Sequence, residues 1–293
     1  MAPKITVFTP TYNRGYIIKR LYDSLRAQSY TGFEWIVIDD GSTDETASLL
    51  AEWAAETREF PLTYRRVENG GKHRAINLGV EMAGGDLFFI VDSDDYLAEN
   101  ALERLVYWEG TIAGMTGFAG VGGLRGFSED EVNGKAFTGE YRDATSLERG
   151  NVFGDKAEAF YTEVLRKYRF PEYEGENFLV EGIVWGAIAD DGLKIRWFNE
   201  IIYIGDYLED GLSKSGAAKL LANPKGYLHY VRQMLTYKMS RQDKLVIIAV
   251  YTKISKQMGL GWRQASREIG VSPLVFLAVK AAYVFYKGIR RGH

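Results

Sequence analysis

The chain has 293 residues, of which 46% are hydrophobic and 26% are charged, and it contains no cysteine. These values are typical of a globular protein with one large or two modest domains and a sizeable apolar core. The absence of cysteine excludes disulfides, thiolate zinc sites and cysteine nucleophiles, and three histidines are too few for a histidine-rich metal cage. Any bound metal is therefore expected to be a hard divalent cation with carboxylate ligands.

Charge is distributed very unevenly along the chain. From Gly211 onward there are 15 Lys and Arg residues and two acids, whereas the first 210 residues hold 21 bases and 37 acids. The net charges of the two parts are +13 and −16. We therefore divide the chain into an acidic domain over residues 1–210 and a basic region over residues 211–293, and we expect the basic region to face an anionic surface, either membrane or nucleic acid.

The first hundred residues alternate strand-like and helix-like patterns at short intervals, which is typical of βαβ units and a largely parallel sheet. Strands are predicted over residues 5–9, 33–38, 62–66 and 87–91, and helices over residues 15–28, 44–57 and 72–82. The run Leu87–Val91 is continuously apolar, as expected of a central strand that is buried on both faces. This part is therefore expected to be an α/β domain.

The patterns beyond this part are less regular. Residues 110–150 are rich in glycine and aromatic residues and are predicted to be mixed sheet and loop, with a strand over residues 118–124. A helix is then predicted over residues 178–189 and a strand over residues 194–204. The basic region is predicted to be helical over residues 217–240, 244–258 and 273–287.

Polar loops follow three of the predicted strands, at Thr9–Arg14, Asp39–Asp44 and Asp92–Asp95. In open α/β sheets, ligands bind outside the carboxyl ends of the strands. Asp92 and Asp94 are two residues apart after a buried strand, so both carboxylates can point into one cleft and hold a cation that bridges phosphate oxygens. Such an ion assists the departure of a diphosphate by electrostatics. The alternative interpretation of this acidic cluster is an Asx-type turn without a ligand.

The other polar segments offer different chemistry. The loop Thr9–Arg14 contains hydroxyl, aromatic, amide and guanidinium groups that suit a nucleobase, although ordinary loop chemistry explains them equally well. The loop Asp39–Asp44 offers acceptors for base and ribose, while Ser42 or Thr43 is expected to cap the next helix. The segment Asn69–Gly79 joins a glycine turn to cations at a helix N-terminus, an arrangement that suits phosphate, with a plain turn as the alternative.

Four motifs occur in a fixed order between Lys4 and about Leu105, namely TPTYNR, VIDDGSTDET, NGGKHRAINLGV and GGDLFFIVDSDD. In these motifs, which cover about a third of the chain, the sequence strongly resembles glycosyltransferase family 2. The resemblance implies the Rossmann-like GT-A fold, with a nucleotide-sugar-binding half over residues 1–105, an acceptor half over residues 106–210 and a helical C-terminal extension. It implies that the following residues bind the nucleotide sugar: Thr9, Tyr12, Arg14, Asp39, Asp40, Lys72, Asp92, Ser93 and Asp95. It further implies that Asp94, together with Asp92, binds the metal.

Members of the family that this chain resembles are mostly inverting, and inversion requires a carboxylate that deprotonates the acceptor hydroxyl. Candidates are Glu174, Glu176 and Glu181. We prefer Glu181, because it precedes a helical run with Trp185 that resembles the second acidic motif of the family. Gly182 stands where that motif usually has aspartate. Glu176 is the second choice, and a solvated glutamate at a helix start is the structural alternative.

The resemblance implies an inverting, hexosyltransferase-type enzyme that depends on Mn²⁺ or Mg²⁺. It would move a sugar from a nucleotide-diphosphate sugar, preferably a UDP-sugar, to a hydroxyl of a glycan or lipid-linked acceptor in surface polysaccharide synthesis. A nucleotidyltransferase with a related two-aspartate metal site is the alternative, but TPTYNR is not the glycine-rich phosphate loop that such enzymes have. A nucleic-acid-binding protein is a remote alternative, and no nucleic-acid partner is expected.

The segment from Ser272 to Arg291 is apolar, aromatic and basic, and it contains no acid. Lys280 interrupts its apolar run, which is shorter than the roughly 20 residues that a spanning helix needs. We expect a helix that lies in the membrane interface, with a terminal helix packed on the catalytic domain as the alternative. The N-terminus lacks the pattern of a signal peptide. The enzyme is therefore expected in the cytoplasm, with possible peripheral attachment to the inner face of the membrane.

Overall fold

The computed structural model describes residues 3–148, 156–206 and 216–290. Its contacts divide the chain into two compact units. The first unit comprises Met1–Phe170 and Ala187–Leu208, and the second comprises Pro171–Gly186 and Glu209–His293. The division falls within helix α6 (Gly182–Asp190), so the segment Pro171–Gly186 belongs with the basic helices that follow the sheet in the sequence.

The first unit is built on a single sheet. Its strands are β1 (Ile5–Thr11), β2 (Phe33–Asp39), β3 (Leu62–Arg66), β4 (Leu87–Ile90), β5 (Tyr96–Leu97), β6 (Phe118–Gly126), β7 (Tyr141–Ala144), β8 (Lys156–Tyr161) and β9 (Lys194–Ile204). Among the described residues the strand order is β3-β2-β1-β4-β8-β6-β9-β5, and β7 pairs with β9. Strands β1 to β4 thus form one half of the sheet, and the later strands extend it beyond β4.

The two halves of the sheet differ in strand direction. The pairs β1/β2, β2/β3 and β1/β4 are parallel, so the loops that follow these strands meet at one edge. Beyond β4, strand β8 runs antiparallel to both β4 and β6, whereas β6 and β9 are parallel. The parallel half therefore contains the strand ends at which the sequence predicts a ligand site.

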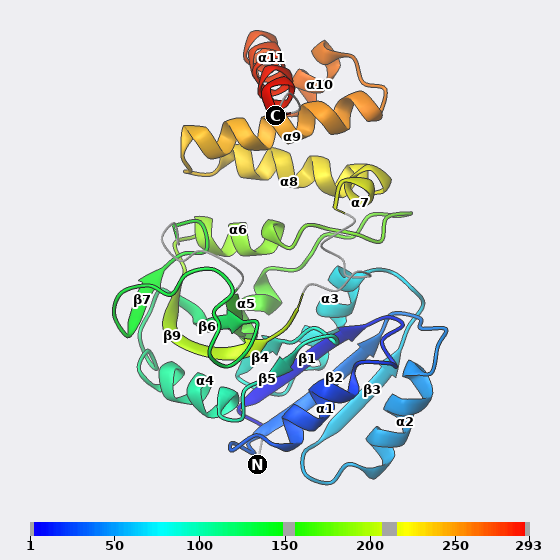
Figure 1. The fold of residues 1–293 in the computed structure, drawn as a ribbon, viewed down its shortest axis with the longest axis vertical. Helices are drawn as coiled ribbons and strands as arrows, with labels where there is room; N and C mark the ends of the chain where they lie inside the picture. Colours follow the sequence, from blue (N-terminus) through cyan, green and yellow to red (C-terminus); the bar gives the residue numbers. More distant parts are fainter. Residues whose placement is uncertain (1–2, 149–155, 207–215, 291–293) are drawn as a thin grey trace. The chain divides into compact units, whose positions relative to one another are not determined.

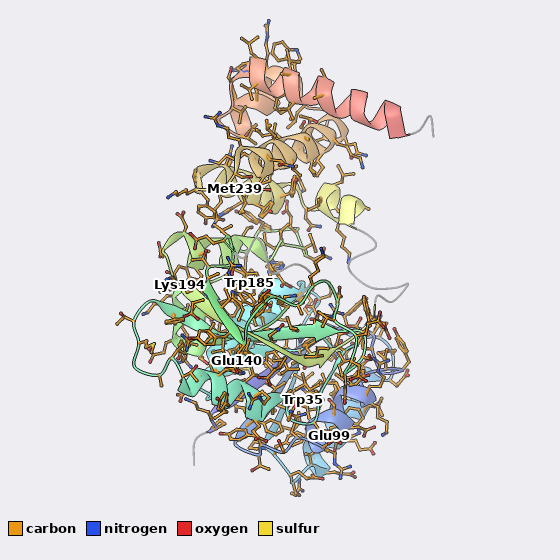
Figure 2. All side chains as sticks on the ribbon, turned by 60° about the vertical axis from the view of Figure 1, so that its left-hand side comes forward. Trp35, Glu99, Glu140, Trp185, Lys194 and Met239 are labelled. Atoms are coloured by element: carbon orange, nitrogen blue, oxygen red, sulfur yellow. The ribbon has the colours of Figure 1, made fainter. Side chains whose placement is uncertain are left out.

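Helices cover both faces of the sheet (Figure 1). They are α1 (Lys19–Arg26), α2 (Thr46–Glu56), α3 (Lys72–Met82), α4 (Ala101–Gly110) and α5 (Thr162–Lys167). Side chains alternate along β1: Val7 joins the core formed with α1, α2 and α4, whereas Phe8 faces α3. A Cβ on Gly79 of α3 would lie 2.2 Å from the Phe8 ring, so only glycine permits this approach. Trp35 is fully buried in the core on the opposite face (Figure 2).

The second unit contains helices α7 (Gly216–Ala222), α8 (Pro224–Thr236), α9 (Arg241–Gln257), α10 (Trp262–Glu268) and α11 (Pro273–Arg290). The single helix expected over residues 217–240 is divided at Asn223, because Pro224 lacks the N–H that an uninterrupted helix needs and instead begins α8. Val231, Tyr251 and Phe276 form part of a separate apolar core. Within the described ranges, every helix is either too short or too polar to cross a bilayer.

Candidate active site

The acidic cluster lies directly after β4, where the sequence predicts it. The Val91 N–H donates to the Phe8 carbonyl at 2.8 Å, so β4 stays beside β1 up to the residue that precedes the cluster. The chain then turns, and the Asp95 N–H donates to the Asp92 carbonyl at 3.1 Å. The cluster therefore begins at the carboxyl edge of the parallel half.

Two cations from other segments meet the first and third members of this cluster. Lys72 Nζ, at the start of α3, lies 2.7 Å from Asp92 Oδ1, and Arg14 Nε, after β1, lies 3.8 Å from Asp94 Oδ2. Burial, with the neighbouring Asp92 charge added to it, raises the pKa of Asp94. The structure thus brings together three predicted segments and concentrates charge of both signs at one place.

Asp95 has a different environment from Asp92 and Asp94. Its side chain is nearly inaccessible, and both carboxylate oxygens accept hydrogen bonds: Oδ1 from Arg125 Nη2 at 3.1 Å and Oδ2 from the Tyr203 hydroxyl at 2.7 Å. Burial, together with the charge of Asp92, raises the pKa of Asp95 to about 7. Asp95 therefore anchors the acidic cluster to β6 and β9.

Tyr203 holds the cluster at a second point, because its hydroxyl also accepts the Asp92 N–H at 3.0 Å. This anchor leaves no space at Gly205, where an added Cβ would lie 1.6 Å from Asp95 Oδ1. Neither Arg125 nor Tyr203 was found from the sequence. Their roles depend on the pairing of β6 with β9, for which no local motif gives a signal. Ser93, within the same turn, is also buried.

The carboxylates after β2 are engaged by the fold itself. Asp39 is fully buried, with Oδ1 accepting the Ser42 N–H at 2.8 Å and Oδ2 accepting the Tyr64 hydroxyl at 3.0 Å. Asp40 accepts the N–H groups of Gly70 and Gly71 at 2.7 and 2.8 Å. Burial raises the pKa of Asp40 in spite of these bonds. Asp39 therefore closes its own loop, and Asp40 fixes the glycine turn that leads into α3.

The loops after β1 and β2 are joined by hydrogen bonds. The Asn13 N–H donates to Ser42 Oγ at 2.9 Å, and Asn13 Oδ1 accepts the Thr43 N–H at 2.7 Å. The expected helix-capping role of Ser42 or Thr43 is therefore not observed. Helix α2 begins later, at Thr46, whose N–H donates to Asp44 Oδ1 at 3.1 Å.

The remaining predicted residues of the first loop differ in exposure. Thr9 is fully buried, and its hydroxyl accepts the indole N–H of Trp35 at 2.9 Å, so it supports the sheet. Tyr12 has 46% of its surface exposed and is available for a ligand. Thr11 was not predicted, but its Oγ1 is buried and has no hydrogen-bond partner among the described residues. It is an additional candidate for a polar contact at this edge.

The candidate bases belong to the second unit. Glu176 is buried and accepts the N–H groups of Lys225 and Gly226, both at 2.8 Å, so it caps the first turn of α8. Glu181 is half-buried and directly precedes α6, where its carbonyl accepts the Val184 N–H at 3.0 Å. Glu174 is exposed. The structural role of Glu176 leaves Glu181 as the preferred base, an assignment that remains a prediction.

A divalent cation fits the donor set of the cluster. Asp92 and Asp94 offer the oxygen ligands that Mg²⁺ and Mn²⁺ prefer, and such an ion would offset the burial and the neighbouring Asp92 charge that raise the pKa of Asp94. In the part of the chain that the structure describes, no three His, Asp or Glu side chains gather into a ready cage. The protein would therefore supply part of the coordination and leave positions for phosphate oxygens.

Solved structures of other proteins with a similar fold identify the fold class of this chain. Residues 1–349 of TarS from Staphylococcus aureus with UDP-GlcNAc superpose with a TM-score of 0.62 at 20% identity, covering 87% of this chain and 73% of that one. The mannosyltransferase PcManGT from Pyrobaculum calidifontis, in complex with GDP-Man and Mn²⁺, superposes with a TM-score of 0.57 at 21% identity. This match covers 99% of this chain and 83% of that one. The fold is therefore GT-A, as the sequence resemblance predicts.

The family follows from the sequence match. Residues 6–110 match the model of glycosyl transferase family 2, and this chain carries a domain of that family. Glycosyltransferase GlyG of Streptococcus pneumoniae is 32% identical over 105 residues, which are 36% of this chain and 35% of GlyG. TarS, named as a poly(ribitol-phosphate) beta-N-acetylglucosaminyltransferase, is 32% identical over 102 residues, 34% of this chain and 18% of TarS. The chain thus aligns with about a third or less of the length of these relatives.

Proposed function

We propose that this protein transfers a sugar from a nucleotide-diphosphate sugar to a hydroxyl group, with a divalent cation held by Asp92 and Asp94. The observation that carries the proposal is the convergence of these carboxylates with Lys72 and Arg14 at the carboxyl edge of the parallel strands. A diphosphate needs both a cation and fixed positive side chains. This edge offers both, on a domain of a glycosyltransferase family.

The cation would neutralise charge on the departing diphosphate. Lys72 and Arg14 now compensate the carboxylates, and they would turn to phosphate oxygens when a metal takes over that role. Tyr12, which is exposed beside Arg14, is suited to stack on the nucleobase. Asp95, through Arg125 and Tyr203, keeps the loop in place during this exchange.

The reaction is proposed to invert the anomeric carbon. The acceptor oxygen forms a bond to that carbon as the bond to the diphosphate oxygen breaks, the acceptor proton passes to Glu181, and the nucleoside diphosphate leaves. A carboxylate that accepts a proton in this way accelerates the reaction by about 10²–10⁴-fold. Glu181 is preferred over Glu176, because both oxygens of Glu176 already bond to the first turn of α8.

The proposed donor is a UDP-sugar, and the proposed acceptor is a glycan or a lipid-linked saccharide of a surface polysaccharide. The similar structure of TarS is a complex with UDP-GlcNAc, and that of PcManGT is a complex with GDP-Man and Mn²⁺. TarS is named for a poly(ribitol-phosphate) acceptor. These similarities support a nucleotide-sugar donor and a hydroxyl-rich acceptor for this chain.

Peripheral membrane attachment is part of the proposal. Leu274 and Val275 on α11 are exposed by 78% and 44%, and the C-terminal region is strongly basic. Exposed apolar side chains with neighbouring cations suit a helix that lies in the headgroup region of an anionic leaflet. Such attachment would bring the enzyme to a lipid-linked acceptor.

The base assignment is tested with Glu181→Gln, after the donor has been identified by screening UDP-, GDP- and TDP-sugars with Mn²⁺. We expect transfer to fall by about 10²–10⁴-fold while the affinity for the donor is unchanged. Glu174→Gln, at an exposed carboxylate of the same segment, is the matched control and should retain activity. Full activity of Glu181→Gln would refute the assignment, and pyrophosphate as the released product would favour a nucleotidyltransferase.

A further inference from the structure

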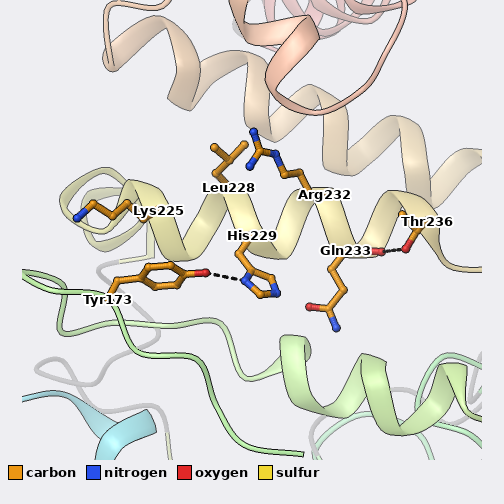
Figure 3. Close-up of a pocket in the computed structure, with 7 residues that line it drawn as sticks. All are labelled: Tyr173, Lys225, Leu228, His229, Arg232, Gln233 and Thr236. Carbon is orange, nitrogen blue, oxygen red and sulfur yellow. Dashed lines mark hydrogen bonds between the residues drawn. The ribbon is translucent and has the colours of Figure 1, made fainter.

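A groove of about 530 Å³ runs along one face of α8 in the second unit (Figure 3). Six of its lining residues lie at helical spacing on α8, and one comes from the segment before α6. The lining residues are Tyr173, Lys225, Leu228, His229, Arg232, Gln233 and Thr236. The proposed sugar-transfer chemistry uses none of these residues.

The middle of the groove is built from an aromatic pair. The Tyr173 hydroxyl and His229 Nδ1 lie 2.6 Å apart, and the two rings meet edge to face (Figure 3). Burial lowers the pKa of His229, which favours the neutral form of its ring. Leu228 lines the groove beside this pair. The middle thus combines apolar ring surface with hydrogen-bonding groups, which suits a sugar or polyol.

The groove has a cation toward each end. Lys225 and Arg232 are seven residues apart on α8, about 10 Å along the helix axis at roughly 1.5 Å per residue. Lys225 Nζ donates to the Glu174 carbonyl at 3.2 Å, and Arg232 bonds to Glu268 Oε2 at 2.6 Å. Both long side chains are therefore partly fixed, which lowers the entropy lost when a ligand binds.

Among the described residues, no carboxylate lines this groove. Two carboxylates that bond to lining residues are occupied by the fold: Glu176 accepts the N–H groups at the start of α8, and Glu268 bonds to Arg232. Gln233 Nε2 donates to the Ile183 carbonyl at 2.9 Å, so the fold holds this amide. The groove therefore offers cationic side chains for an anionic group.

We propose that this groove binds a sugar or polyol unit that carries phosphate groups. Phosphates would bond to Lys225 and Arg232, and the carbon chain with its hydroxyls would lie over Tyr173 and His229. The inference rests on the proposed function, since it assigns a phosphate-bearing acceptor to the transfer reaction. Two separated cations favour a ligand with two phosphates over one with a single phosphate.

The test measures direct binding by calorimetry, with fructose 1,6-bisphosphate, glucose 6-phosphate, glucose and inorganic phosphate as probes. We expect affinity to fall in the order bisphosphate, monophosphate, glucose, with inorganic phosphate weaker than either sugar phosphate. Lys225→Gln with Arg232→Gln should weaken bisphosphate binding by on the order of tenfold or more. Lys253→Gln with Lys256→Gln, at exposed lysines of α9, makes the same charge change and should have no effect.

Two further variants test whether a loss of binding is caused by misfolding and whether the bisphosphate binds at another site. Lys225→Gln alone leaves the Arg232–Glu268 pair intact and should weaken bisphosphate binding several-fold. Asp92→Asn with Asp94→Asn removes the proposed donor site and should leave bisphosphate binding unchanged. Loss of bisphosphate binding in this second variant would place the ligand at the donor site and overturn the proposal.

Other results separate this inference from the proposed function. If a nucleotide sugar binds with Mn²⁺ but the bisphosphate does not bind, the groove assignment fails and the proposed function stands. If the bisphosphate binds in the groove but no nucleotide sugar binds, the proposed function fails. Equal affinity for inorganic phosphate would overturn the sugar-phosphate assignment. The assignment would also be overturned if binding to phosphatidylglycerol vesicles depended on Lys225 and Arg232 while binding of the bisphosphate did not.

Discussion

The loops after β2 and β4 both begin with aspartates at the same edge of the sheet, yet they use these residues differently. After β2, both carboxylates accept backbone or tyrosine donors of the protein. Asp39 is fully buried, and although Arg66 Nε lies 3.9 Å from its Oδ2, both of its oxygens are already hydrogen-bonded. After β4, Asp92 and Asp94 instead face the side-chain cations Lys72 and Arg14. An acidic strand-end loop can thus be either part of the fold or a ligand site.

The partners explain the difference. Backbone N–H groups are fixed by the fold, so a ligand can displace them only by unfolding the turn. Long cationic side chains can move to phosphate oxygens when a metal ion replaces them. Asp95 also has a cationic partner, Arg125, but it is buried and its second oxygen accepts the Tyr203 hydroxyl, so the fold holds both of its oxygens.

The largest effect is expected for Asp94→Asn. The variant should fold normally, since Asp94 Oδ2 lies 3.8 Å from Arg14 Nε and forms no close structural bond there. Transfer should fall about a thousandfold, because several kcal/mol of charge stabilisation correspond to about three powers of ten in rate. Steady-state kinetics with Mn²⁺ measures this fall in transfer. Wild-type turnover in the variant would show that Asp94 is not a metal ligand.

A smaller effect is expected for Tyr203→Phe, which removes the hydroxyl that joins the Asp92 N–H to Asp95 Oδ2. Losing a group that orients metal ligands typically costs about 10–100-fold in metal affinity or activity. The apparent affinity for Mn²⁺ should fall while the protein remains folded. Tyr64→Phe, which removes a hydroxyl bonded to Asp39, is the matched control and should leave Mn²⁺ affinity unchanged. Equal losses in both variants would contradict the division between the loops.

The smallest effect on catalysis is expected for Asp40→Asn. The new amide would turn an N–H donor toward Gly70 or Gly71, whose N–H groups need acceptors. We expect a loss of about 1–3 kcal/mol in the free energy of unfolding, with the turnover of the folded enzyme nearly preserved. Chemical denaturation measures this, with Glu68→Gln at a neighbouring exposed acid as the control. A large drop in turnover without loss of stability would instead indicate ligand contact at Asp40.

Much of the fold was predictable where one local signal dominated. The bounds of β3, α3 and β9 coincide with the predicted ranges, because their apolar periodicity is bounded by turn residues. Strand β8 was not predicted, since its place between β4 and β6 depends on antiparallel pairing with residues far away in the sequence. Helix α6 begins at Gly182, later than the expected start at Phe178.

The site was predictable to a similar extent. The position of Asp92 and Asp94 near Lys72 and Arg14 follows from the rule that parallel strands end at one edge, together with the four motifs. The partners of Asp95 do not follow from it, because Arg125 and Tyr203 come from strands whose register is set by tertiary contacts. The bonds of Asp40 depend on the shape of a glycine turn that the sequence places nearby but does not orient.

The most direct test of the central claim is the effect of Mn²⁺ and nucleotide sugar on thermal unfolding. With Mn²⁺ present, the donor at about 100 times its dissociation constant should stabilise the wild type by about 2.7 kcal/mol. The same addition should stabilise Asp40→Asn equally and leave Asp94→Asn unchanged. Stabilisation of Asp94→Asn by the same amount, with the same dependence on Mn²⁺, would contradict the assignment of the metal-dependent donor site to the loop after β4.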